Sequence, residues 1–295
     1  MSRPVTVGLD GSPESIAAAH WAAREASLLA APLHLVHAGD QPPHAYVPFA
    51  GEAVPPPGAD RSAHLLREVE TALGRDHPRL RITSQRLAGR PATALVAAAR
   101  ESELLVLGSR GLGRAAGYLL GSVASAVVAR TPRPVVLVRA GTETADGHRP
   151  DSPGTPFGAA ALRDVVLGLE LHDLPAHTLL AFAFEAAARH SVPLRVVHGW
   201  KPEPRAGAGG EPEVRTEETV AAMLRPWRDK FPGVEVTDEA AIGSAGAHLV
   251  DSSRDASLVV VGRRNRPGPL GPHIGPVTQQ VLQGSEAPVV VVPLS

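Results

Sequence analysis

The sequence contains an internal repeat, which limits the chain to two copies of one structural unit. The string VGLD at 7–10 returns as LGLE at 167–170. Preserved order with small changes in spacing indicates a duplication in which connecting loops changed length. The other recurring segments are 32–37 with 193–198, 104–108 with 258–262, and 134–138 with 288–292.

The length of 295 residues agrees with two domains of ordinary size. The residues between the copies are rich in glycine and proline, a composition that buries little apolar surface and is typical of a linker. We predict a first domain at 1–140, a linker at 141–161 and a second domain at 162–295.

Short apolar runs alternate with alanine-rich stretches of helical period in both copies. Runs that are apolar throughout are typical of parallel strands with helices on both faces. In the first copy we predict strands at 5–9, 33–38, 80–87, 104–107 and 135–138, and helices at 13–31, 61–75, 91–101 and 123–130. The predicted strands of the second copy are 165–169, 194–198, 234–240, 258–261 and 289–292. The predicted fold class is therefore α/β, with two tandem doubly wound, Rossmann-like domains, each a five-stranded parallel sheet of order 3-2-1-4-5.

Composition excludes several classes of function. The chain contains no cysteine, which excludes disulfides, thiol catalysis and zinc sites built on thiolates. The formal net charge of −1 does not indicate a nucleic-acid partner. No apolar run reaches the roughly 18 residues of a membrane span, and the first residues show no apolar signal segment. We expect a cytoplasmic protein that does not associate with membranes.

The end of the first predicted strand carries the first candidate site residues. Gly8 lies inside an apolar strand, where a glycine marks close approach by a ligand or by packed protein. Ser12 precedes Pro13 and is the predicted N-cap of the first helix, which leaves the Asp10 carboxylate without a capping role. That carboxylate can accept hydrogen bonds from ribose hydroxyls or an adenine amino group. The alternative for Asp10 is a local Asx turn.

A glycine-rich loop follows the fourth predicted strand and carries the second set of candidates. Closely spaced glycines let backbone N–H groups converge on an anion, and a following helix N-terminus adds partial positive charge. Ser122 is the predicted N-cap of that helix, and two arginines supply fork-shaped donors. The alternative is a flexible turn followed by an ordinary helix cap. The candidate residues of the loop are Gly108, Ser109, Arg110, Gly111, Leu112, Gly113, Arg114, Gly121, Ser122 and Val123.

The predicted topology brings these two regions together. In a sheet of order 3-2-1-4-5 the first and fourth strands are neighbours where the strand order reverses, and ligands bind outside the carboxyl ends of strands at such a point. Asp10 and the glycine-rich loop then face each other, with Val36 and Ala38 at the end of the second strand forming an apolar wall. The sequence therefore predicts a mononucleotide site.

These residues resemble the universal stress protein family, in its tandem-domain form, over nearly the whole chain. The nucleotide motif of that family, Gly-x2-Gly-x9-Gly-Ser/Thr, matches Gly108, Gly111, Gly121 and Ser122. The resemblance implies binding of ATP, with or without Mg²⁺. It places Asp10 near the adenosine, Val36 beside the base, and the loop with Ser122 and Val123 on the phosphates. It also implies a role in stress response or dormancy.

The second copy departs from this motif. Asn265 replaces the second motif glycine, Pro276 replaces Ser122, and Glu170 replaces Asp10. Proline has no N–H to offer a phosphate. We expect a degenerate half that completes the fold, while its clustered arginines leave open the binding of a different anion.

The leading hypothesis is a regulatory protein that holds ATP as a signal and has no catalytic residues. One alternative is a slow ATPase or phosphotransferase, with Mg²⁺ supplied together with the nucleotide. Another is an interaction scaffold that works without nucleotide. The expected partners are an adenine nucleotide and a downstream protein, and a homodimer of whole chains remains open.

Overall fold

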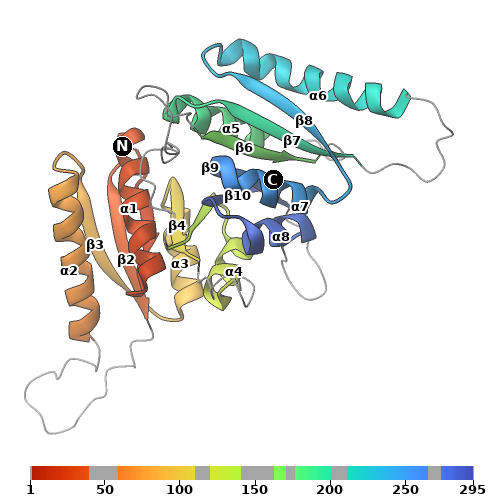
Figure 1. Cartoon of the computed structure of the whole chain (residues 1–295). Coiled ribbons are helices and arrows are strands. Elements are labelled where there is room, and N and C mark those ends of the chain that lie inside the picture. Colours follow the sequence, from red (N-terminus) through yellow and green to blue (C-terminus); the bar gives the residue numbers. More distant parts are fainter. Residues whose placement is uncertain are drawn as a thin grey trace, which may run out of the picture. The chain divides into compact units, whose positions relative to one another are not determined.

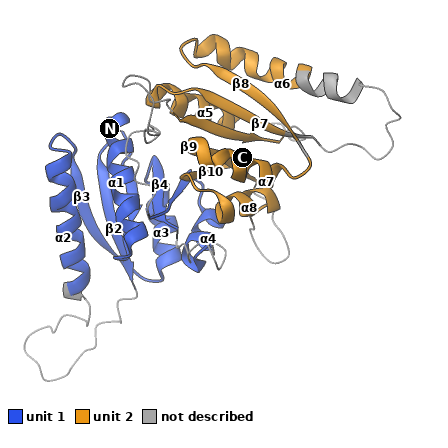
Figure 2. Cartoon of the chain, viewed as in Figure 1, with its two compact units in different colours: residues 1–141 blue, residues 142–295 orange. Residues whose placement is uncertain are grey.

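The protein is described here by a computed structural model, in which the chain divides into two compact units, Met1–Gly141 and Thr142–Ser295 (Figure 2). The structure describes residues 2–39, 59–109, 120–140, 163–170, 177–200, 211–264 and 274–294. The predicted linker at 141–161 lies outside these residues. Each unit is considered by itself below.

The first unit is a parallel sheet in which helices and strands alternate along the chain (Figure 1). Its elements are β1 (Val5–Gly8), α1 (Pro13–Leu28), β2 (Leu33–Gly39), α2 (Ala59–Asp76), β3 (Ile82–Ala88), α3 (Pro91–Arg100), β4 (Leu104–Gly108), α4 (Ser122–Arg130) and β5 (Val135–Val138). The strand order is β3-β2-β1-β4-β5, and α1 packs against α2 while α3 packs against α4. Right-handed crossovers that run in opposite directions from β1 place these two helix pairs on opposite faces of the sheet.

The second unit repeats this plan, with strand order β8-β7-β6-β9-β10. Its elements are β6 (Asp164–Leu169), α5 (His177–His190), β7 (Leu194–Trp200), α6 (Glu211–Lys230), β8 (Val236–Ile242), α7 (Ala245–Ser252), the short 3-10 helix η1 (Ser253–Asp255), β9 (Ala256–Arg264), α8 (Pro276–Gly284) and β10 (Val289–Leu294). The described pairings in both sheets are parallel, so the predicted fold class is confirmed.

The core of the first unit follows from its apolar strands and its alanine-rich first helix. The central strands β1 and β4 are buried along their length, and α1 turns a face of fully buried alanines toward them. A polar residue inside β1, Thr6, is also fully buried, and its hydroxyl lies 2.6 Å from that of Ser102. The mutual hydrogen bond satisfies both hydroxyls, which would otherwise be costly to bury.

The register of the first sheet brings the carboxyl ends of three strands to one edge. Gly8 at the end of β1 lies opposite Val36 of β2 on one side and Leu107 of β4 on the other. The chain therefore leaves β1 and β4 side by side, at the point where the strand order reverses. This edge is the place where an open α/β sheet binds ligands.

Gly108, the last residue of β4, fixes how closely the first helix approaches this edge. A Cβ atom on Gly108 would lie 2.6 Å from the carbonyl carbon of Glu14 and 2.6 Å from the amide nitrogen of Ser15. Both atoms belong to the backbone of α1, so no side chain can rotate away to make room. The first turn of α1 thus rests directly on the end of β4.

We predict opposite effects on stability for two glycine-to-alanine substitutions in this unit. Gly108→Ala must push α1 away from β4, and overpacking of this kind costs about 1–3 kcal/mol of unfolding free energy. Gly74→Ala, near the end of α2, meets nothing within 4 Å and should stabilise the protein by about 0.5–1 kcal/mol because alanine is the better helix former. Urea denaturation of both variants checks the difference, and an unchanged midpoint for Gly108→Ala would contradict the close approach.

Candidate functional site

The turn between β1 and α1 is organised by two linked side chains. The Oδ1 atom of Asp10 accepts hydrogen bonds from the backbone N–H of Ser12 at 3.0 Å and from the Ser12 hydroxyl at 2.5 Å. The Ser12 Oγ atom in turn accepts from the backbone N–H of Ser15 at 3.2 Å, which confirms Ser12 as the N-cap of α1. The Asp10 carboxylate does not cap the helix but makes the local Asx-type turn that the sequence left open as the alternative, and this turn orients the cap.

Ser15 joins this turn to the end of β4. Its side chain is buried, and its Oγ atom accepts from the backbone N–H of Asp10 at 3.4 Å and donates to the carbonyl of Ser12 at 2.9 Å. Its own backbone is the surface that excludes a Cβ atom from Gly108. Asp10 and Gly108, 98 positions apart in the sequence, are therefore brought to one place through Ser15. No sequence pattern indicated a role for Ser15.

The end of β2 is tied to the residue before Asp10. The backbone N–H of Leu9 donates to the carbonyl of Val36 at 2.8 Å, and Nδ1 of His37 lies 2.8 Å from the carbonyl oxygen of Leu9. A carbonyl oxygen only accepts, so the proton of this bond is on Nδ1 of His37. Val36 is fully buried and Ala38 is partly exposed, so Ala38 is the residue of the expected apolar wall whose side chain reaches the surface.

Gly8 has a packing role that both units share. A Cβ atom there would lie 2.6 Å from Cδ2 of Leu107 and 3.3 Å from Cδ2 of Leu95, so side chains of β4 and α3 fill its space. Gly168, at the same position of the second unit, would bring a Cβ atom to 2.8 Å from Cδ1 of Leu249, a residue of α7. This repeated contact favours the packing interpretation that the sequence left open.

The loop after β4 is described only at its two ends. Ser109 is buried, and its backbone N–H donates to the carbonyl of Val138 at 2.7 Å. The described residues begin again at Leu120 and lead into α4, where Val123 is partly buried. The candidates that lie outside the described residues are Arg110, Gly111, Leu112, Gly113 and Arg114.

The start of α4 corrects one prediction. Gly121, with φ −59° and ψ 148°, is the N-cap, and its carbonyl accepts from the backbone N–H of Ser125 at 2.9 Å. Ser122 was predicted to be the cap, but it is the first residue of the helix and is exposed. The N–H groups of a helix's first turn have no acceptor within the helix, so the amide of Ser122 is available to an anion.

The corresponding helix of the second unit lacks this donor. Gly275 is the N-cap of α8 with φ −62° and ψ 156°, and Pro276 is the first helical residue. Proline suits that position because its fixed φ is helical and no hydrogen bond is lost, yet it removes the N–H that Ser122 provides. Asn265 lies outside the described residues.

The two arginines at the end of β9 are an ion-paired residue, Arg264, and a buried residue, Arg263. Nη2 of Arg264 lies 2.9 Å from Oε2 of Glu170. Arg263 is almost fully buried, and burial lowers the pKa of its guanidinium. The positive potential that the sequence indicated here is thus partly neutralised by the unit's own carboxylate.

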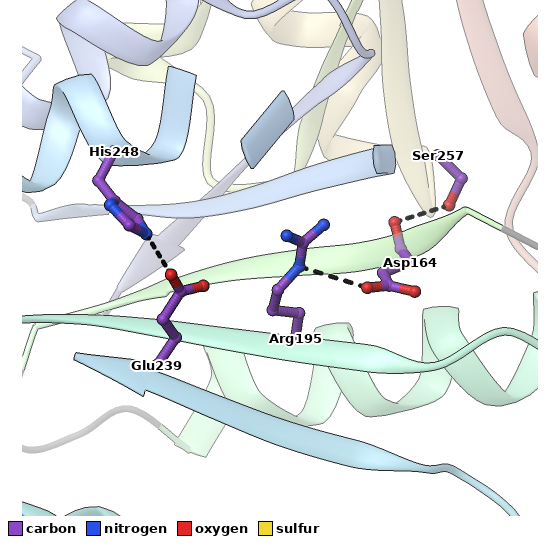
Figure 3. Close-up of polar contacts among 5 residues, drawn as sticks. All are labelled: Asp164, Arg195, Glu239, His248 and Ser257. Carbon is purple, nitrogen blue, oxygen red and sulfur yellow. Dashed lines mark hydrogen bonds and ion pairs between the residues drawn. The ribbon is translucent and has the colours of Figure 1, made fainter. Parts of the chain in front are cut away.

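Other polar contacts of the second unit join its elements rather than line the carboxyl edge (Figure 3). Asp164, the first residue of β6, pairs with Arg195 of β7 at 3.3 Å and accepts at its carbonyl from the Ser257 hydroxyl at 3.1 Å. Burial raises the pKa of the Asp164 carboxyl, an effect that Arg195 opposes. His248 of α7 lies 2.9 Å from Glu239 of β8. Asp164 and Arg195 lie near the amino ends of their strands, so we assign the pair a structural role.

In the described part of the chain, histidines, aspartates and glutamates form no group of three or more that could hold a metal ion. None of the helices in this part of the chain combines the length and apolar character needed to cross a membrane.

Comparison with known proteins gives one consistent result. The profile of the Universal stress protein family matches residues 1–139 and 162–293. Universal stress protein Rv2005c from Mycobacterium tuberculosis is 32% identical over 305 residues, covering 99% of each chain. The crystal structure of a universal stress protein from Archaeoglobus fulgidus superposes with a TM-score of 0.69 at 15% identity, covering 99% of both chains. A universal stress protein solved in complex with cAMP is 31% identical and covers 48% of this chain and 99% of its own, with a TM-score of 0.36.

We predict that Asp10 contributes to stability without any ligand. Asp10→Ala removes the acceptor of two hydrogen bonds from Ser12 and should cost about 0.5–1.5 kcal/mol of unfolding free energy. Asp10→Asn keeps a carbonyl oxygen at the same place and should cost less than half as much. Denaturation of nucleotide-free protein checks the order, and equal losses for the two variants would contradict the Asx turn.

Proposed function

The chain belongs to the universal stress protein family, in its tandem two-domain form, and we propose that its first unit binds ATP at the carboxyl edge of its sheet. One observation carries the proposal. Asp10 and Gly108 meet through Ser15 beside the reversal of strand order, and the helix that follows the glycine-rich loop begins at Ser122, an exposed residue whose backbone N–H has no acceptor within the helix. An acceptor for sugar hydroxyls and a donor for phosphates are thus supplied from neighbouring strands.

Asp10 suits the sugar side of such a ligand. A carboxylate is an acceptor with about four lone-pair sites, a type of group that suits ribose hydroxyls. The two hydrogen bonds from Ser12 fix the orientation of the carboxylate before a ligand arrives, which lowers the entropic cost of binding. The partly exposed side chain of Ala38, at the end of β2, offers apolar surface to the adenine ring.

The phosphate side is assigned to the loop and to α4. The N-terminus of α4 combines an available N–H with the partial positive charge of the helix dipole. The glycines at 111 and 113 allow backbone N–H groups of the loop to turn toward a phosphate, and Arg110 and Arg114 add charged donors. Mg²⁺ would enter together with the nucleotide.

We propose that the bound nucleotide acts as a signal in stress response or dormancy. In this role ATP stabilises one state of the protein and is not rapidly turned over. Measuring nucleotide hydrolysis in the same preparations used for binding separates this role from that of a slow ATPase. A turnover rate that falls to background in Asp10→Asn would favour the enzyme instead.

We predict one ATP per chain. At an ATP concentration of about 100 times Kd, binding stabilises the folded protein by roughly 2.7 kcal/mol. For a unit of this size, this free energy corresponds to a rise in Tm on the order of 5–10 °C. Isothermal titration calorimetry measures the stoichiometry directly. A value of two would show that Pro276 does not disable the second unit, and absence of any heat or shift would remove the nucleotide from the function.

Exchanging the first residues of α4 and α8 gives a second prediction. Ser122→Pro keeps a good first helical residue but deletes the N–H and the hydroxyl, so ATP affinity should fall roughly 10–100-fold, the value of a charge-assisted hydrogen bond. Asp10→Asn should weaken binding as well, while leaving the turn in place.

The matched control is Pro276→Ser in the second unit, which we expect to leave both affinity and stoichiometry unchanged. Circular dichroism and Tm verify that each variant is folded. Unchanged affinity in folded Ser122→Pro would exclude the α4 N-terminus from the site.

A further inference from the structure

An ion pair crosses the carboxyl edge of the second sheet at its own reversal of strand order. Glu170 directly follows β6, and Arg264 is the last residue of β9. These two strands are neighbours in the sheet, and their side chains meet with Oε2 and Nη2 2.9 Å apart. The pair therefore spans the gap between the two strand ends.

The same two places flank the proposed nucleotide site in the first unit. Glu170 occupies the repeat position of Asp10, and Arg264 occupies that of Arg110, two residues after the glycine that matches Gly108. Packing beneath the edge is also preserved, since Gly8 and Gly168 are both enclosed by a leucine of the third helix in their unit. The two edges thus share the packing of this glycine, while their polar groups differ.

The acidic residue has a different partner in each unit. In the first unit Asp10 turns toward Ser12 and holds the start of α1. In the second, leucine and histidine follow Glu170 where glycine and serine follow Asp10, so the sequence offers no serine at that position. Glutamate has one more methylene group, and its carboxylate reaches the arginine on the neighbouring strand.

The exposure of the two partners indicates which one is replaceable. The Arg264 side chain is 24% exposed, whereas that of Glu170 is 69% exposed. A guanidinium that is largely shielded from water is stabilised by an anionic partner. Glu170 meets this requirement from the solvent side, the side from which a free anion would also approach.

We propose that Glu170 is a built-in ligand of the second unit, filling at Arg264 the position that a phosphate-type anion would otherwise take. Arg264 is then the anion-binding residue of this edge, and the carboxylate excludes phosphate both by occupying the donor and by like-charge repulsion. The proposal concerns the second unit alone, and its outcome does not depend on nucleotide binding by the first.

The test uses the full-length chain and inorganic pyrophosphate, which needs no contact to a base or sugar. Glu170→Gln keeps the shape of the side chain but removes its charge. We expect pyrophosphate affinity, measured by calorimetry, to rise roughly two- to fivefold, and the number of bound anions per chain to increase by one. Any binding by the first unit is the same in the parent and in the variants and cancels from the comparison.

Two further variants make the result specific. Glu239→Gln removes the same charge from the same unit but breaks the pair with His248, so it should give no gain. Glu170→Gln combined with Arg264→Gln should lose the gain entirely. Glu170→Ser serves as a second neutral variant if the glutamine variant fails to fold.

No gain in folded Glu170→Gln or Glu170→Ser would overturn the proposal. A gain that survives removal of the arginine, or that Glu239→Gln reproduces, would overturn it equally. A gain that survives removal of the arginine would mean that the anion binds elsewhere. A gain that Glu239→Gln reproduces would mean that the change in net charge causes it.

Discussion

The contact between Gly108 and the first turn of α1 is the constraint on which the first unit's edge depends. Two stretches of backbone touch there, and no rotation of a side chain can relieve the contact. Because α1 is held against β4, the turn that precedes it must also lie beside β4. Asp10, Ser12 and Ser15 then form one hydrogen-bonded group at the place where the sheet reverses its strand order. The arrangement of the candidate site at this edge follows from close packing, before any functional group is considered.

Local sequence patterns predicted the fold and part of the edge because the relevant interactions are short in range. Uniformly apolar strands indicate a buried parallel sheet, and a serine before Pro13 indicates a helix cap. The predicted N-cap of α4 was wrong by one residue. Gly121 takes the extended cap conformation, and because it has no side chain, the sequence pattern indicated Ser122 instead. His37 could not be found, since its bond to Leu9 spans 28 positions. The hydrogen bonds of Ser15 are local, but its contact with Gly108 is set by tertiary packing, so its role could not be found either. The loop arginines lie outside the described residues, so their assignment rests on sequence alone.

The two units share their strand order and the packing of one strand glycine, but they differ in the polar groups at the carboxyl edge. The glycines at 8 and 168 are enclosed in the same way, and the strand orders correspond. The polar groups above them differ at each decisive place: an aspartate that orients a helix cap against a glutamate that pairs with an arginine, and a serine against a proline at the helix start. Duplication has thus preserved what the sheet needs to fold, while the exposed edge has changed.

Pro276 gives this divergence a direction in evolution. Serine and proline codons can differ by a single base, so the step from a helix start that offers an N–H to one that lacks it is genetically short. The step is also favourable for folding, because proline pre-forms the first turn of α8 and restricts the unfolded chain. A change from Pro276 to serine would give up that stability, and selection acts against such losses in marginally stable proteins. One copy of a duplicated domain can therefore evolve toward higher stability. The other copy can then retain residues that lower stability but serve a ligand.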